Sequence, residues 1–101
     1  MSAEIETRLT ELGIVLPQAA APAANYVPFV VSGSTLYISG QLPLDDGKVA
    51  VTGHVGKDVD VATAQRAAEL CAINILAQAK AALGGDLSRI RRLVKINGFV
   101  A

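Results

Sequence analysis

The segment Leu36-Tyr37-Ile38-Ser39-Gly40-Gln41-Leu42-Pro43 ends a strand-like run with small and polar residues. Ser39 offers a hydroxyl, Gly40 lets a ligand approach the backbone closely, and the amide of Gln41 can both donate and accept hydrogen bonds. Small-molecule sites commonly place a few polar groups of this kind in a mainly apolar pocket. The segment therefore indicates a strand end that can hold a small polar ligand.

The residues around this segment predict β-structure. Residues 28–39 are rich in β-branched and aromatic residues, and Gly33-Ser34 in their middle suits a two-residue hairpin turn with glycine first. Asp45-Asp46-Gly47 signals a second turn, after which residues 48–52 can form a short third strand. A β-hairpin over residues 28–39 is the firm expectation here.

The N-terminal part predicts a short helix followed by a connector. Apolar residues recur at helical spacing over residues 2–12. Pro17 and Pro22 restrict the backbone of residues 14–26, so we expect an extended connector on the surface there.

The longest periodic segment predicts a helix over residues 61–83. Asp60 can cap its N-terminus, and Gly84-Gly85 can end it. Its apolar stripe contains mostly small residues, which would let the helix pack closely on a sheet. The stripe consists of Ala64, Ala68, Cys71, Ile75, Ala79 and Ala82, and is widened by Ala72, Leu76 and Leu83.

Residues 90–100 alternate in the manner of a strand. The expected order of elements places one long helix over a mainly antiparallel sheet, which is an α+β domain covering residues 1–101. The second face of that sheet also carries apolar side chains. In so small a chain the simplest cover for that face is another subunit.

Composition narrows the class of protein. The chain has 101 residues, 51% of them apolar, and equal numbers of basic and acidic residues, nine of each. This balance disfavours a general nucleic-acid binder, whose affinity depends on neutralising phosphates. The single Cys71 excludes an intrachain disulfide and fits a reducing compartment. With no secretory signal pattern and no apolar run long enough for a membrane span, we expect a cytoplasmic protein without membrane contact.

Other residues with chemical potential have plainer interpretations. His54 has no second metal ligand near it in the sequence, so a loop position or a pocket rim is favoured over a metal site. Cys71 falls within the apolar stripe and is expected to be structural rather than nucleophilic. Arg89, Arg91 and Arg92 suit a solvated sheet edge better than an anion site. The chain has no phosphate-binding glycine loop, and no cofactor or metal is expected.

Three further residues leave two interpretations open. Asn97 and Phe99 share one face of the strand predicted over residues 90–100, and Tyr26 precedes the first strand. In the structural interpretation Phe99 is core, Asn97 lies near an edge and Tyr26 faces solvent. In the functional one, Asn97 and Phe99 approach the pocket below Ser39 and Gln41, and Tyr26 points into an inter-strand cleft.

Taken together, these residues resemble the signature of the RidA/YjgF family, also called endoribonuclease L-PSP or chorismate mutase-like proteins. The signature is Tyr26, Gly33 and the strand that ends in Ser39-Gly40-Gln41. Residues 64–87 resemble the family's first helix with its glycine exit, and residues 93–100 its following strand. The resemblance covers roughly residues 14–101, and the additional N-terminal helix resembles the branch of longer members.

The resemblance implies a ferredoxin-like, chorismate mutase-like fold assembled as a homotrimer. Clefts between its subunits would hold small carboxylates and 2-keto acids, and the implied activity is hydrolysis of reactive enamines and imines to a 2-keto acid and ammonia. By position, Tyr26 and Ser39 would supply hydroxyls and Gly40 would admit the ligand. Phe99 would wall the pocket, Gln41 would brace the strand end, and Asn97 would support the pocket.

The chain also departs from the family pattern. Family deaminases hold the substrate carboxylate with an arginine in a Pro-Ala-Arg-Ser-like segment and orient water with a glutamate, and neither occurs before Ala101. Val27 stands where short members carry serine. The sequence can be partial, another chain can supply the remainder, or the protein can be a short member without the activity. Exposed apolar sheet surface favours the first explanation.

Three functions follow as expectations. The first is an enamine/imine deaminase, a hydrolase that is active in the full-length protein. The alternative is a trimer that binds small carboxylates or keto acids without turnover. The third, an endoribonuclease, is disfavoured by the neutral charge.

Overall fold

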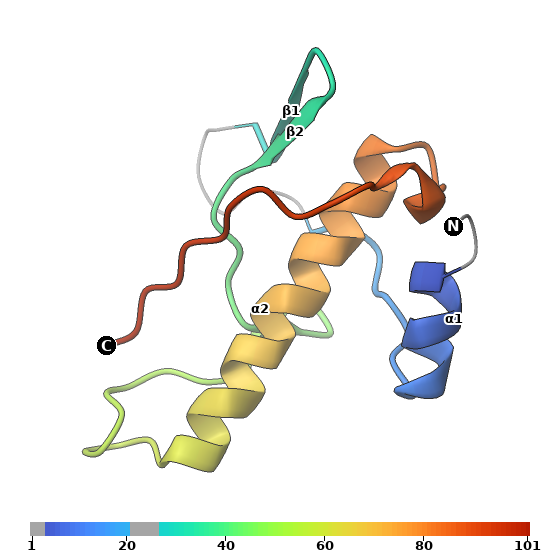
Figure 1. Ribbon diagram of the computed structural model, residues 1–101. Helices are drawn as coiled ribbons and strands as arrows, with labels where there is room; N and C mark the ends of the chain where they lie inside the picture. Colours follow the sequence, from blue (N-terminus) through green and yellow to red (C-terminus); the bar gives the residue numbers. More distant parts are fainter. Residues whose placement is uncertain (1–3, 21–26) are drawn as a thin grey trace.

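The long helix α2, Val61–Ala82, is the element on which the other elements assemble (Figure 1). This computed structural model describes residues 4–20 and 27–101. Helix α2 packs against the strands β1, β2 and β3, and a short N-terminal helix packs against a 3-10 turn that follows α2. The remaining elements are α1 (Glu4–Glu11), β1 (Phe29–Ser32), β2 (Thr35–Ile38), β3 (Leu44–Asp45), β4 (Lys48–Val49) and η1 (Leu87–Arg89).

Both ends of α2 lie where the sequence predicts them. Asp60 has extended backbone, and its carboxylate accepts the N–H of Thr63 at 2.8 Å, which satisfies a donor in the first turn. At the other end, Leu83 N–H donates to Ala79 O at 3.0 Å, and Gly85 N–H donates to Lys80 O at 2.8 Å. Gly84 there has a φ of +68°, a left-handed conformation that glycine adopts without strain.

Two antiparallel hairpins follow from local turn chemistry. β1 and β2 pair from Phe29↔Ile38 to Ser32↔Thr35, so Gly33-Ser34 is the two-residue turn that the sequence predicts. β3 and β4 pair at Leu44↔Val49 and Asp45↔Lys48, across Asp46-Gly47. Asp46 and Gly47 both have positive φ, 53° and 78°, as the common Asp-Gly hairpin turn requires.

The core lies at the C-terminal end of α2, where α1 and η1 meet it (Figure 1). Leu9, Ala79 and Leu87 are buried there, and Leu87 is 0% exposed. Their partly buried apolar neighbours are Ile5, Ile14, Leu16, Leu36, Ile38, Leu76 and Ile90. This end of the helix is therefore covered from several sides.

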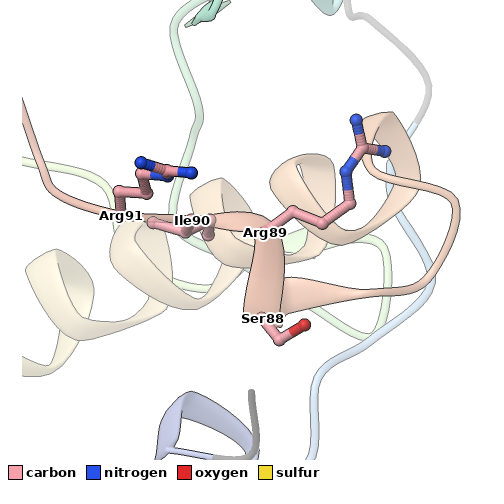
Figure 2. Close-up of a pocket in the computed structure, with 4 residues that line it drawn as sticks. All are labelled: Ser88, Arg89, Ile90 and Arg91. Carbon is pink, nitrogen blue, oxygen red and sulfur yellow. The ribbon is translucent and has the colours of Figure 1, made fainter. Parts of the chain in front are cut away.

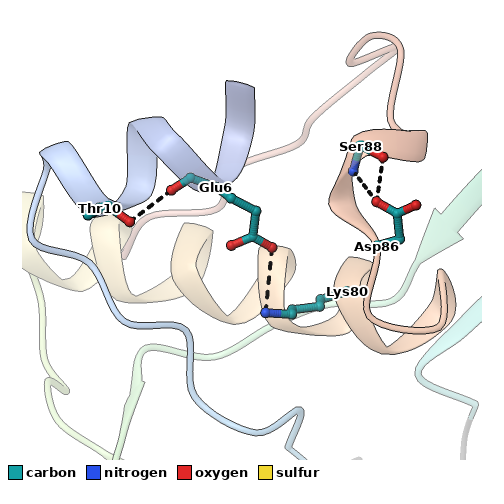
Figure 3. A network of polar contacts seen from close by, with 5 residues as sticks. All are labelled: Glu6, Thr10, Lys80, Asp86 and Ser88. Carbon is teal, nitrogen blue, oxygen red and sulfur yellow. Dashed lines mark hydrogen bonds and ion pairs between the residues drawn. The ribbon is translucent and has the colours of Figure 1, made fainter. Parts of the chain in front are cut away.

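Polar contacts reinforce the same end of the molecule (Figure 3). Lys80 Nζ of α2 lies 3.5 Å from Glu6 Oε1 of α1, and Thr10 Oγ1 donates to Glu6 O at 3.1 Å. Asp86 caps η1, where its carboxylate accepts both the hydroxyl and the N–H of Ser88. These two hydrogen bonds, with Arg89 nearby, hold the pKa of Asp86 below its usual range.

The buried face of α2 differs from the predicted alanine stripe. Its buried residues are Leu70, Asn74, Ala77, Gln78 and Ala79, whereas Ala68 and Ala72 of the stripe are exposed. The helix carries apolar side chains on more than one side, so periodicity alone does not select the covered face. Two amides turn inward because they meet backbone carbonyls there.

Residues 90–100 do not form the predicted strand, and this prediction is wrong for the described chain. After η1 the segment continues as irregular chain to the C-terminus (Figure 1). A strand needs a neighbour with which to exchange backbone hydrogen bonds. No strand lies beside this segment in the described residues, and Val55 N–H to Ala101 O, at 2.9 Å, is a contact with a loop. Its large apolar side chains are exposed: Leu93, Val94, Ile96, Phe99 and Val100.

The fold class is nevertheless the expected one, an α+β arrangement of antiparallel strands with one long helix. Neither of the α-helices in the described ranges has both the length and the apolar character needed to cross a bilayer.

Candidate functional site

The candidate site starts at Ser39, the residue that follows β2. Its N–H donates to Pro28 O at 3.0 Å, and its Oγ lies 2.5 Å from Val27 O and 2.9 Å from Pro28 O. A hydroxyl donates a single proton, so these two carbonyls share it, while its oxygen lone pairs can still accept a hydrogen bond. Ser39 thereby holds the exit of β2 against the entry of β1 and keeps accepting capacity for a ligand.

Gln41 and Gly40 complete the strand end. Gln41 Nε2 donates to Ser39 O at 3.0 Å, which is the contact expected of a brace. Within residues 4–20 and 27–101, a Cβ atom on Gly40 would meet nothing within 4 Å beyond its chain neighbours, so this side of the residue has room for a small group. Because the φ of Gly40 is not in the left-handed region, the fold does not need glycine there for its backbone. The small residue is instead suited to close approach by another molecule.

Asn74 of α2 holds the segment that follows this strand end. Its side chain is 3% exposed, and Nδ2 lies 3.0 Å from Leu44 O and 3.4 Å from Leu42 O. The same amide donates to Leu70 O, one helical turn back, at 2.8 Å. Sequence reasoning placed Asn74 only within a matching segment and did not assign it this role. The available signal was a carboxamide in an otherwise apolar stretch of helix.

Gln78 lies one turn further along α2 and makes a comparable contact with the connector. It is 2% exposed, and its Nε2 donates to Ala20 O at 2.8 Å. Sequence reasoning also missed this residue. The pair Asn74 and Gln78, spaced by four, lies on one face of the helix and gives a combined signal that neither gives alone.

The other predicted site residues are not brought to the strand end. Tyr26 lies outside the described residues. Asn97 and Phe99 lie in the irregular C-terminal segment, and Phe99 is 95% exposed, so it touches almost nothing in the described part of the chain. Their roles in a pocket shared between subunits stay predictions.

Cys71 and His54 have the plain roles that the sequence favours. Cys71 on α2 is partly buried, and this burial raises the pKa of its thiol, which favours the protonated thiol over the nucleophilic thiolate. His54 is in a hydrogen-bonded loop, where its backbone N–H donates to Asp58 Oδ2 at 3.2 Å. Within residues 4–20 and 27–101, no three His, Cys, Asp or Glu side chains gather as a metal site would require.

The basic residues after α2 border an open hollow lined by Ser88, Arg89, Ile90 and Arg91 (Figure 2). Arg89 Nη1 lies 3.4 Å from Leu83 O, at the C-terminus of α2, and the Ser88 hydroxyl donates to Asp86. In Figure 2 the Ser88 hydroxyl turns away from both guanidinium groups. The polar groups of this hollow do not converge on one point, which favours solvated arginines over an anion site. Because residues 90–100 form no strand, these arginines do not lie at the predicted sheet edge.

A sequence model of the family described as "YjgF/chorismate_mutase-like, putative endoribonuclease" matches residues 6–101, nearly the whole chain. The chain belongs to the YjgF/chorismate mutase-like family. The resemblance seen in the Ser39-Gly40-Gln41 segment is thus confirmed at the level of the family.

Solved structures of YjgF-like fold agree with this assignment. The Agrobacterium tumefaciens protein Atu1372, of unknown function, superposes with a TM-score of 0.81 at 69% identity, over 92% of this chain and 56% of that one. A protein of Shewanella oneidensis MR-1 described as a putative endoribonuclease gives a TM-score of 0.78 at 42% identity, over 83% of this chain and 55% of that one.

Among curated proteins, Protein TCP17 of Trypanosoma cruzi is 48% identical over 99 residues. The match covers 98% of this YjgF-family chain and 61% of TCP17. The chain therefore spans about three fifths of the length of this relative.

Proposed function

We propose that the protein to which this YjgF-family chain belongs hydrolyses reactive enamines and imines of small carboxylic acids, releasing ammonia and a 2-keto acid. The observation that carries the proposal is the braced and open strand end. Ser39 is held by two carbonyls, Gln41 donates to the carbonyl of Ser39, and a Cβ atom built on Gly40 would meet no atom of the described residues within 4 Å apart from its chain neighbours. A preorganised polar wall of this kind suits a small planar ligand.

Hydrolysis of an imine needs few functional groups from the strand end at Ser39-Gly40-Gln41. An enamine first becomes the imine by gaining a proton at carbon and losing one from nitrogen. Water then adds to the carbon of the C=N bond, its protons pass to the nitrogen, and the C–N bond breaks to release ammonia and leave a carbonyl. The side of the site formed by this chain would orient the substrate: the Ser39 oxygen accepts a hydrogen bond from the imine or enamine N–H, and Gly40 leaves room for the neighbouring carboxylate. The group that holds the carboxylate and the group that orients water would come from residues outside these 101.

The proposed site lies in a cleft between subunits of a homotrimer. The support is apolar surface: Val30, Val31 and Tyr37 on the first hairpin are exposed, as is Phe99 in the C-terminal segment. A surface of this kind on a small domain is suited to subunit contact. A neighbouring subunit would bring cover to the hairpin and give Phe99 and Asn97 a pocket to border. A cytoplasmic setting suits this protein, since its lone cysteine is a free thiol.

Two other functions remain to be separated from this one. A trimer that binds small carboxylates without turnover would use the same wall, because the hydrogen bonds at Ser39 and Gln41 hold this strand end in place whether or not a reaction follows. Ribonuclease activity is suggested by the description of the Shewanella oneidensis relative. The nine basic and nine acidic residues of this chain provide no excess of positive charge for RNA.

The test uses the full-length protein and freshly generated 2-aminoacrylate, with pyruvate and ammonia as the measured products. We expect release above the uncatalysed rate, and a loss of about tenfold or more in kcat/KM for Ser39→Ala, the value of one hydrogen bond made to the reacting group. Ser32→Ala, on the exposed end of β1, is the matched control and should retain the full rate.

A wild-type rate equal to background would overturn the deaminase. Calorimetric binding of 2-oxobutyrate without turnover would then support the binding trimer. Cleavage of a labelled single-stranded RNA that stops in Ser39→Ala would support the ribonuclease instead.

A further inference from the structure

Two buried amides of α2 hydrogen-bond to two separate chain segments, the one that follows the candidate strand end and the N-terminal connector. Asn74 contacts the carbonyls of Leu42 and Leu44, which directly follow Ser39-Gly40-Gln41. Gln78 contacts the carbonyl of Ala20, in the connector that leads toward Tyr26. These segments are more than twenty residues apart in the sequence, and the two amides bring both onto one helix face.

We infer that Asn74 and Gln78 are positioning residues, which set the strand end and the connector at a fixed distance from each other. Their spacing of four residues corresponds to about 6 Å along the helix axis, at about 1.5 Å per residue. Because the helix is rigid, it fixes the distance between the two segments. The inference about ligand binding rests on the proposed function, whereas the inference about backbone placement does not.

The contacts are directed at the first residue of β3, Leu44, and at Leu42 in the link that precedes it. Leu42 and Pro43 lie between β2 and β3 and belong to neither strand. Pro43 O accepts the N–H of Ala50 at 3.0 Å, and Leu44 N–H donates to Leu42 O at 2.8 Å, so the turn is tight. Asn74 supplies the hydrogen bonds that a neighbouring strand would supply elsewhere in a sheet.

The burial of Asn74 and Gln78 indicates that their amides are needed for hydrogen bonding at these positions. A buried carboxamide is costly unless its polar atoms are paired, and an apolar residue would fill the same space with less penalty. In the described chain, no buried side-chain nitrogen or oxygen lacks a partner. Both amides thus fix backbone carbonyls at defined positions. Apolar side chains in their place would pack without direction and would not fix where these segments lie.

The first experiment needs no ligand. Amide hydrogen exchange is measured in the full-length protein for wild type, Asn74→Leu and the control Gln65→Leu, which removes an exposed amide from the same helix. We expect the Ser39 and Ala50 amides, both hydrogen-bonded at 3.0 Å, to exchange about tenfold faster or more in Asn74→Leu, relative to the amides of α2. Gln65→Leu should leave them unchanged. Equal acceleration of every amide would overturn the inference, because it reports only lost global stability.

The second experiment measures the dissociation constant of 2-oxobutyrate by calorimetry. Asn74→Leu and Gln78→Leu should each weaken binding by about tenfold, the value of one positioning hydrogen bond. Asn74→Gln, which keeps an amide, should recover part of the affinity. Unchanged affinity with lowered stability would overturn the inference about ligand binding and assign Asn74 a purely structural role.

The outcomes separate this inference from the proposed function. If wild type binds no 2-oxobutyrate, the proposed function fails in that arm and the exchange experiment alone decides the positioning role. If Asn74→Leu does not fold, Asn74→Ser provides the milder loss of the amide, and the same local acceleration is expected in it.

Discussion

The two halves of α2 are both rich in alanine, but they differ in their large apolar residues and in their environments. From Leu70 to Ala79 the helix contains all five of its buried residues, whereas from Val61 to Glu69 none of its residues is buried. Both halves are regular helix. The large aliphatic residues of α2 lie almost entirely in the buried half, so the sequence indicates which half is covered. The neighbouring segments decide which face of that half is buried, and there Asn74 and Gln78 turn inward.

The contrast has a functional side. The C-terminal half supports the core around Leu87 and carries the two amides that hold the segment after the candidate strand end and the N-terminal connector. The N-terminal half is reached through a tight loop and is held mainly by its own cap. Four changes, taken from the largest expected effect to the smallest, test whether the halves differ as much as the structure indicates.

Leu87→Ala should have the largest effect on stability. Leu87 is fully buried between α1 and α2, so its truncation should lower the free energy of unfolding by about 2–5 kcal/mol, the usual cost of a large-to-small change in a core. Leu93→Ala, at an exposed leucine six residues later, should cost less than about 0.5 kcal/mol. Urea unfolding of both variants measures the difference, and equal losses would contradict the placement of the core.

Gly53→Ala should have the next largest effect on stability. Gly53 has a φ of +126°, and a Cβ atom there would lie 2.9 Å from Asp58 Cβ and 3.1 Å from Val59 Cγ2. We expect a loss of about 1–3 kcal/mol from backbone strain and this contact. Gly98→Ala is the control, since its backbone is not left-handed and nothing lies within 4 Å. A neutral result for Gly53→Ala in thermal unfolding would show that the loop before α2 is not rigid.

Asp60, at the start of α2, should make a pH-dependent contribution to the free energy of unfolding. Hydrogen bonds from the side chain and then the backbone of Thr63 hold the pKa of Asp60 below its ordinary value of 3.8. Because the folded pKa is the lower one, the stabilisation is complete above pH 3.8 and is lost as the pH falls through the folded value.

Asp60→Asn keeps a capping side chain but cannot titrate, so it should be less sensitive to acid than wild type. Unfolding midpoints measured from neutral pH to below pH 3 compare the two. Parallel pH profiles would show that the cap contributes nothing to acid sensitivity.

Breaking the ion pair on the exposed half should have the smallest effect. Arg66 Nη1 lies 3.2 Å from Glu69 Oε1, and both side chains are about half exposed. Arg66→Met should change the free energy of unfolding by less than about 0.5 kcal/mol, and the change should shrink further in high salt because solvent and ions screen the pair. A loss comparable with that of Leu87→Ala would mean that this half of α2 is covered after all.

Much of the local structure follows from short-range chemistry that the sequence displays. Gly33-Ser34 and Asp46-Gly47 set the hairpin turns, and Asp60 with Gly84-Gly85 sets the limits of α2. Each of these signals acts over four residues or fewer. They are predictable because a turn or a cap depends mainly on its own residues.

The structural features that could not be predicted from the sequence depend on partners that are distant along the chain. The inward direction of Asn74 and Gln78 depends on carbonyls between 30 and 58 residues away. The alternation of residues 90–100 shows which side chains share a face but cannot provide a neighbouring strand. At the candidate site, the strand end at Ser39 was predictable from its motif, whereas the position of Phe99 depends on what lies opposite.

The most direct test of the account is a titration of the ¹⁵N-labelled full-length protein with 2-oxobutyrate, followed by backbone amide chemical shifts. The account predicts shifts concentrated at Ser39, Gly40 and Gln41, extending to the segment of Leu42–Leu44 that Asn74 holds. Shifts confined to residues 88–91, around the open hollow of Figure 2, or no shifts at millimolar ligand, would contradict it.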